Sequence, residues 1–158
     1  MGKKEKARKA RQAKEAIEVF YEFCCMGDLK GVRASLKAGL DVNSEFYEMR
    51  GLMAAVIYGH NAVVGLLLKQ KGIEVDIVGA YLDDQYRGLS LLMVAVLRDN
   101  VDCVKLLLDA RADPNIKDPP YDEEYEGFSP LMFAVRQIST QSWLLILTSH
   151  VCCQAQPS

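Results

Sequence analysis

Cysteine and histidine are the side chains of this sequence that could support catalysis or metal binding. They are Cys24, Cys25, Cys103, Cys152, Cys153, His60 and His150. A thiolate beside a histidine would be a nucleophile, and a set of four such side chains could hold zinc. However, no pattern places Cys24, Cys25 or Cys103 beside a histidine, and adjacent cysteines lack the usual ligand spacing. The P-loop, GxGxxG and HExxH motifs are absent. The sequence therefore predicts no catalytic residue, no metal site and no cofactor.

Tyrosine beside carboxylates is a second recurring combination, and its chemistry suits binding rather than catalysis. Three clusters contain the candidate partner-binding residues: Phe46 and Tyr47; Tyr81, Asp83, Asp84 and Tyr86; Tyr121, Asp122, Glu123, Glu124 and Tyr125. Tyrosine gives a large, rigid contact at low entropic cost, and carboxylates steer a basic partner. The alternative is that these are solubilising loops whose tyrosines pack locally.

A copy of one apolar segment follows each of these clusters, at residues 50–56, 90–96 and 129–135. Equivalent positions hold Leu52, Leu92 and Leu131, then Met53, Met93 and Met132, then Ala55, Ala95 and Ala134. The first two copies lead into Val63-Val64-x-x-Leu67-Leu68 and Cys103-Val104-x-x-Leu107-Leu108, whose spacing places the apolar side chains on one helical face. Each copy thus predicts a pair of helices, with the three methionines and Cys103 in the core.

Short motifs between the helices recur in a fixed order. Gly59-His60 and Asp99-Asn100 follow the first two apolar segments, and Ala112-Asp113-Pro114-Asn115 follows the second predicted helix pair. Ser90 and Ser129 are predicted to cap helices, and Gly39 and Gly72 to end them with a positive φ.

Together these motifs, with the helix start Ser129-Pro130-Leu131, resemble the ankyrin repeat over roughly residues 16–136. The resemblance implies an all-α fold, an ankyrin-repeat solenoid of stacked helix pairs with elongated β-hairpin finger loops. It implies about four repeats, the last degenerate or truncated, and the usual repeat length in the family is about 33 residues. It also implies helix breaks at Gly59-His60 and Asp99-Asn100, a repeat exit at Ala112-Asp113-Pro114-Asn115, and a structural role for His60 at its helix break.

The ends of the chain differ from the repeats. Residues 1–15 are predicted to be a basic N-terminal helical extension: seven Lys/Arg against two Glu give a net charge of +5, and since the whole chain carries −2, the rest carries −7. This extension is interpreted as a solvated helix or frayed tail, or alternatively as a nuclear-import signal or a nucleic-acid contact. It has no aromatic residue for stacking on bases. Residues 16–136 form the predicted repeat domain, and 137–158 a degenerate last helix and tail with an apolar end.

The expected function is a non-catalytic protein–protein interaction module, an adaptor or scaffold that binds through its finger loops and concave face. Its expected partner is another protein, preferably with a basic surface; a small-molecule substrate is not expected, and nucleic acid is the less favoured partner. The alternative is a regulatory or targeting subunit whose basic N-terminal helix contacts nucleic acid or an acidic membrane surface. No apolar run approaches the ~18 residues of a membrane span, and unpaired cysteines indicate an intracellular protein, cytoplasmic or nuclear.

Overall fold

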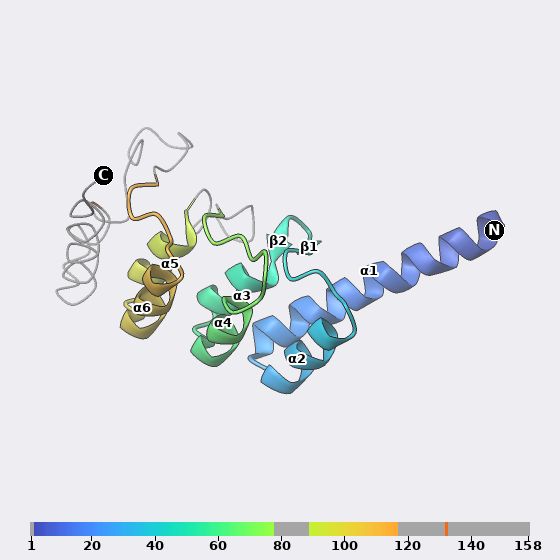
Figure 1. Cartoon of the computed structure of the whole chain (residues 1–158), viewed down its shortest axis with the longest axis horizontal. Helices are drawn as coiled ribbons and strands as arrows, with labels where there is room; N and C mark the ends of the chain where they lie inside the picture. The colour runs from blue at the N-terminus through green and yellow to red at the C-terminus, as the bar shows by residue number, and fades with distance from the viewer. Residues whose placement is uncertain (1, 78–88, 117–131, 133–158) are drawn as a thin grey trace. The chain divides into compact units, whose positions relative to one another are not determined.

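The computed structural model describes residues 2–77, 89–116 and 132. The described residues form six α-helices and one two-stranded β-hairpin (Figure 1). The chain divides into two compact units, Met1–Ile73 and Glu74–Ser158, and each is described by itself.

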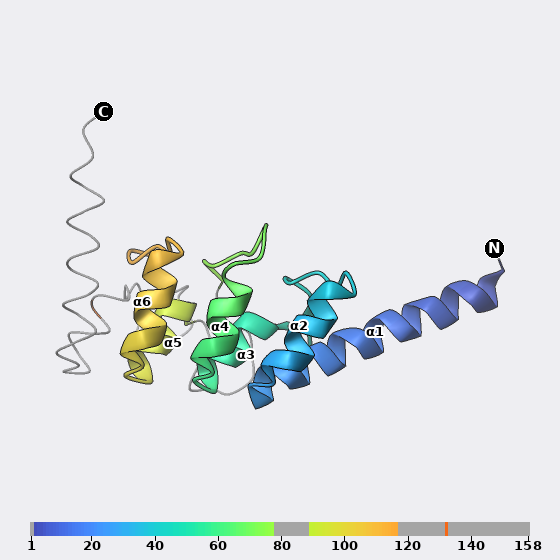
Figure 2. The same ribbon diagram turned by 60° about the horizontal axis from the view of Figure 1, so that its bottom comes forward.

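The first unit begins with one long helix, α1, at Lys3–Met26. Its first half is rich in Lys, Ala and Gln, which favour helix without any tertiary contact. Residues 2–16 are all exposed, and Phe20 and Cys24 are the buried side chains of the helix. The N-terminal half of α1 extends beyond the part that lies beside α2 (Figures 1 and 2). The helix ends at Gly27, whose φ of 72° is left-handed.

Helix α2 (Leu29–Lys37) returns along α1 after a tight turn. The turn is fixed by Asp28, whose carboxylate accepts hydrogen bonds from the backbone N–H of Lys30 and Gly31 at 3.0 and 3.1 Å. This is an N-cap, which satisfies donors that the first helical turn leaves unpaired.

A second helix pair, α3 (Gly51–Ile57) and α4 (Asn61–Leu67), packs on the first, with α3 against α1 and α4 against α2. All seven residues of α3 are buried. The close approach of α3 to α1 requires glycine at position 51, because a Cβ there would lie 2.7 Å from Cys24 Sγ and 2.8 Å from Phe20.

The second unit contains the helix pair α5 (Leu91–Leu97) and α6 (Val101–Asp109). The predicted cap at Ser90 is confirmed, because its hydroxyl accepts a hydrogen bond from Met93 N at 3.3 Å. Asn100 caps α6 in the same way, accepting from Cys103 N at 3.1 Å. The other predicted cap, Ser129, lies outside the described residues.

Left-handed residues recur at equivalent helix ends. The predicted positive φ at Gly39 and Gly72 is confirmed, with values of 89° and 80°. The helix break at Gly59 has φ 75°, and its equivalent Asp99 has φ 50°. At the exit after α6 the same conformation falls on Arg111, with φ 66°. The backbone plan is therefore repeated even where the glycine is replaced.

The core follows the predicted positions in both units. Met53, Met93 and Cys103 are each no more than 1% exposed, as the repeated pattern predicts. The prediction is wrong for Met132, which is 51% exposed. Met132 belongs to the third copy of the motif, whose other residues lie outside the described residues.

The described helix pairs and the small hairpin agree with the all-α helix-pair solenoid predicted from the sequence. The long N-terminal helix crosses the predicted boundary at residue 15 without a break. The predicted terminal segment 137–158 lies outside the described residues.

Candidate functional site

The first predicted finger is a β-hairpin in the first unit, formed by β1 (Glu45–Phe46) and β2 (Met49–Arg50) (Figure 1). The strands are antiparallel, with Glu45 opposite Arg50 and Phe46 opposite Met49. Tyr47 and Glu48 make the two-residue turn with φ of 49° and 62°. Positive φ at both turn residues is the geometry of a type I′ turn, which matches the twist of a hairpin.

A cross-strand ion pair closes the base of this hairpin. Arg50 Nε donates a hydrogen bond to Glu45 Oε1 at 2.9 Å. The Arg50 side chain is 20% exposed and that of Glu45 is 50% exposed. Such an exposed pair contributes about 0.2–1 kcal/mol, so it sets the register of the strands more than it stabilises the fold.

Aromatic contacts fix the hairpin on α1. The ring of Phe46 lies 5.5 Å from that of Tyr21, and 4.6 Å from that of Tyr47 in an edge-to-face arrangement. Met49 lies directly opposite Phe46 in the register and therefore shares its face of the hairpin, and it is 2% exposed. The hairpin is therefore tied to the unit through the face that carries Phe46 and Met49.

Tyr47 is the exposed end of this aromatic row. Its side chain is 75% exposed, the highest value among the large hydrophobic residues of the described chain. Lys14 Nζ of α1 lies 6.0 Å from the centre of the Tyr47 ring, within the range of a weak cation–π contact. The turn thus presents an aromatic surface to solvent from a supported base.

The other predicted partner-binding residues belong to the second and third fingers. They are Tyr81, Asp83, Asp84, Tyr86, Tyr121, Asp122, Glu123, Glu124 and Tyr125, and all lie outside the described residues. Of the predicted set, the structure brings Phe46 and Tyr47 together and places Phe46 inward and Tyr47 outward.

Tyr21 and Tyr58 are not among the binding residues that the sequence predicts. Tyr21 supports Phe46 and lies one helical turn before Cys25. Burial, then the neighbouring Cys25, raises the pKa of Tyr21 far above its ordinary value. Tyr58 is 53% exposed at the end of α3, and its ring stacks on His60 at 6.4 Å. The available signal for Tyr21 was its spacing of four residues from the apolar Ile17.

His60 has the structural role that its place at the helix break predicts. Its Nε2 lies 2.8 Å from the carbonyl oxygen of Cys25, 35 residues earlier in the chain. The ring also covers Gly27, where an added Cβ would meet Nδ1 at 2.6 Å. The turn between α3 and α4 is therefore bonded to the end of α1.

The thiols of the described chain are suited to packing rather than to nucleophilic chemistry. Burial raises the pKa of Cys24 to about 12, with a further contribution from Cys25, and burial raises that of Cys103 to about 12. Burial also raises the pKa of Cys25. Such thiols stay protonated at neutral pH, and the reactive form is the thiolate. Within the described residues, no group of three or more His, Cys, Asp or Glu is arranged to hold a metal ion.

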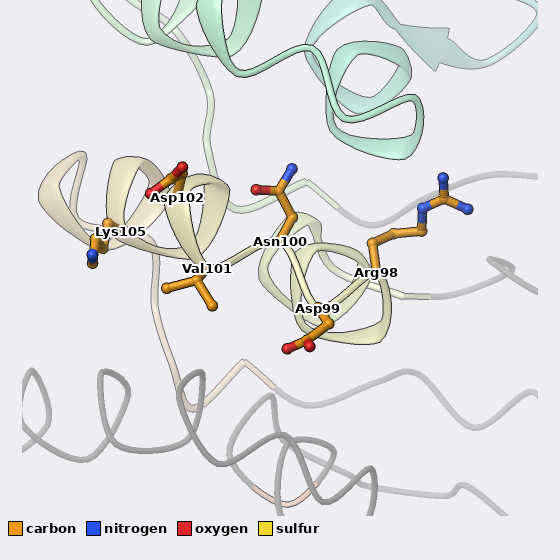
Figure 3. Close-up of a pocket in the computed structure, with 6 residues that line it drawn as sticks. All are labelled: Arg98, Asp99, Asn100, Val101, Asp102 and Lys105. Atoms are coloured by element: carbon orange, nitrogen blue, oxygen red, sulfur yellow. The ribbon is translucent and has the colours of Figure 1, made fainter.

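A hollow of about 580 Å³ lies at the turn between α5 and α6 (Figure 3). Its lining includes Arg98, Asp99, Asn100, Asp102 and Lys105. Figure 3 shows these side chains spreading in different directions rather than converging on one point. Since Asn100 caps α6, Asp102 lies in its first turn and Asp99 forms the left-handed break, these residues serve the helix turn.

The helix pairs and the hairpin can now be compared with known protein families. The family model described as ankyrin repeats (3 copies) matches residues 23–118 and again residues 78–155. The chain belongs to the ankyrin-repeat family, and its helix pairs and hairpin are those of an ankyrin-repeat solenoid. Ankyrin repeats generally mediate binding to other proteins, and domains of this kind are typically non-catalytic.

A comparison with curated proteins found no match. No helix among the described residues is both long enough and apolar enough to cross a membrane.

Proposed function

We propose that this protein is a non-catalytic adaptor or scaffold of the intracellular space that binds a partner protein through its finger loops and concave face. The observation that carries the proposal is the first finger. Its backbone is held by an ion pair at the base and by Phe46 on Tyr21, yet Tyr47 at its tip is 75% exposed. A rigid support for an exposed tyrosine lowers the entropy lost on binding.

The charge of the fingers favours a basic surface on the partner. Glu48 is exposed beside Tyr47, and the clusters at residues 83–84 and 122–124 add five carboxylates. Carboxylates around an aromatic contact raise the rate of encounter with a basic partner and disfavour acidic ones. We expect that rising salt slows association with the partner more than it speeds dissociation.

Quantitative affinity capture from cell extract tests this proposal with three baits. They are the native chain, a finger variant and a control, Tyr58→Ser. The finger variant changes Tyr47, Tyr81, Tyr86, Tyr121 and Tyr125 to Ser, and Asp83, Asp84, Glu123 and Glu124 to Lys. Circular dichroism checks that each bait is folded. The proposal expects specific preys that the finger variant loses and the control retains. Preys retained by the finger variant would show that the fingers are not the binding surface.

A second candidate function is targeting through the basic half of α1. It is supported by one observation, that residues 3–16 form helix and are exposed throughout. Such a helix would contact an anionic surface, either nucleic acid or a membrane, while the repeats bind protein.

A further inference from the structure

The charge of α1 changes sign in the middle of the helix. Residues 3–14 contain seven Lys/Arg and one Glu, a net charge of +6, whereas residues 15–26 contain three Glu and no Lys/Arg, a net charge of −3. The change coincides with the start of packing, since Ile17 is the first residue of the helix that is partly buried. We call residues 3–14 the basic arm.

The basic arm has few charge partners inside the protein. Within the described residues one salt bridge joins it, between Lys9 Nζ and Glu5 at 3.7 Å, and both side chains are at least half exposed. Lys14 lies over the Tyr47 ring at 6.0 Å. These contacts are weak, so most of the positive charge of the arm is available to an external anion.

The cations of the arm lie on all sides of the helix. With 3.6 residues per turn, Lys3, Arg8 and Lys9 point in directions roughly 100–140° apart. The apolar residues of the arm are alanines alone, so it has no apolar face. A helix bound in a membrane interface needs such a face, and a flat anionic surface meets only one side of a helix. This distribution suits an anion that surrounds the helix.

The major groove of B-form DNA is such an environment. It is about 12 Å wide, admits an α-helix and is bordered by phosphates on both sides. The exposed part of α1 is about 20 Å long, which is enough to cross this groove. The narrow major groove of duplex RNA excludes a helix, and the lack of aromatics in the arm disfavours single strands.

We propose that the basic arm binds duplex DNA by entering the major groove, with its lysines and arginines neutralising phosphates on both sides. The acidic half of α1 limits the contact, because Glu15, Glu18 and Glu22 repel the same phosphates. The inference rests on the second candidate function and is independent of partner binding by the fingers. It gives this ankyrin-repeat protein a sequence-independent DNA contact beside its protein-binding surface.

Fluorescence anisotropy of a labelled 20-base-pair DNA duplex, titrated with the full chain, tests the proposal. The arm variant changes Lys3, Lys6, Arg8, Lys9 and Arg11 to Gln. The control variant changes five exposed cations elsewhere, Lys30, Arg33, Lys37, Lys69 and Lys71, to Gln. Both variants therefore have the same net charge. We expect the arm variant to bind the duplex at least about 100-fold more weakly than the native chain, because phosphate contacts are lost, and the affinity of the control to change less than about 3-fold. Each phosphate contact also contributes about 0.9 to the slope of log K against log salt. The arm variant, which loses five such contacts, should flatten that slope by about 4.5.

A third variant, Ala10→Pro, keeps every charge and breaks the helix within the arm. Groove binding predicts at least a roughly 10-fold loss for this variant, since a kinked arm no longer fits the groove. Equal binding by Ala10→Pro and the native chain, or equal losses in the arm and control variants, would overturn the proposal. Vesicles of phosphatidylserine and phosphatidylcholine supply the last comparison. Binding to vesicles but not to duplex would refute DNA binding and leave membrane targeting, and binding to neither would refute both.

Discussion

Replacing Gly27 by alanine tests the junction between α1 and the next helix pair. Gly27 has φ 72°, and a Cβ at this position would lie 2.6 Å from Nδ1 and 2.8 Å from Cγ of His60. The imidazole is not free to retreat, because its Nε2 lies 2.8 Å from the carbonyl oxygen of Cys25. The substitution therefore imposes both a strained backbone and a displaced ring.

Gly39→Ala separates these two effects. Gly39 has φ 89°, and a Cβ there would meet nothing within 4 Å, so its substitution measures backbone strain alone. A side chain in the left-handed region costs about 1–2 kcal/mol, part of which is recovered because alanine lowers the entropy of the unfolded chain. Gly27→Ala adds overpacking or loss of the His60 hydrogen bond, each worth about 1–3 kcal/mol. We expect about 1 kcal/mol for Gly39→Ala and about 2–4 kcal/mol for Gly27→Ala.

Urea unfolding followed by far-ultraviolet circular dichroism gives both free energies of unfolding. Repeating the two substitutions in a His60→Ala background completes a double-mutant cycle. Because the ring is then absent, the difference between the two glycine positions should fall to near zero. Equal losses at both positions in the native background, or a difference that survives without His60, would refute the assigned contact.

Three further predictions concern the second unit and the buried thiols. Arg111→Gly should raise the free energy of unfolding by about 0.5–1 kcal/mol, because Arg111 has φ 66° and glycine relieves that strain; a loss of stability in urea would contradict it. Ser90→Ala should lower it by about 1 kcal/mol through loss of the hydrogen bond from Met93 N, whereas Ser90→Thr should retain most of the stability. Burial raises the pKa of Cys24 and Cys103 to about 12, so the unfolded chain loses these protons first and stability should fall as the pH rises from about 9 towards 12. Between pH 8 and 11, the free energy of unfolding should fall less steeply with pH in Cys103→Ala than in the native chain. Identical slopes in the two proteins would show that ionisation of Cys103 is not the cause.

The sequence determines the repeated core well because periodicity is a local signal. The equivalent positions of Met53 and Met93, the cap at Ser90 and the helix break at Gly59 are all visible in the repeat itself. Each of these features depends on residues within a few positions of one another. That locality is why the fold class follows from the sequence alone.

The contacts that build the first finger are not visible in the same way. The turn at Tyr47-Glu48 contains neither glycine nor asparagine, so the usual hairpin signal is absent although both residues have positive φ. The contact of Phe46 with Tyr21 joins segments 25 residues apart, and the bond of His60 to Cys25 spans 35 residues. Such pairings depend on how helices stack, which a single sequence does not specify.

Site-specific photo-crosslinking from the tip of the first finger tests most directly whether this finger is a binding surface. A benzophenone side chain replaces Tyr47, which is 75% exposed, and in a matched protein it replaces Tyr58, which is 53% exposed. Both proteins are illuminated in cell extract, with and without excess unlabelled native chain. Our account predicts a discrete crosslinked protein from position 47 that the native chain competes away, and little or none from position 58. Equal crosslinking from the two positions, or a product at position 47 that the native chain does not displace, would contradict it.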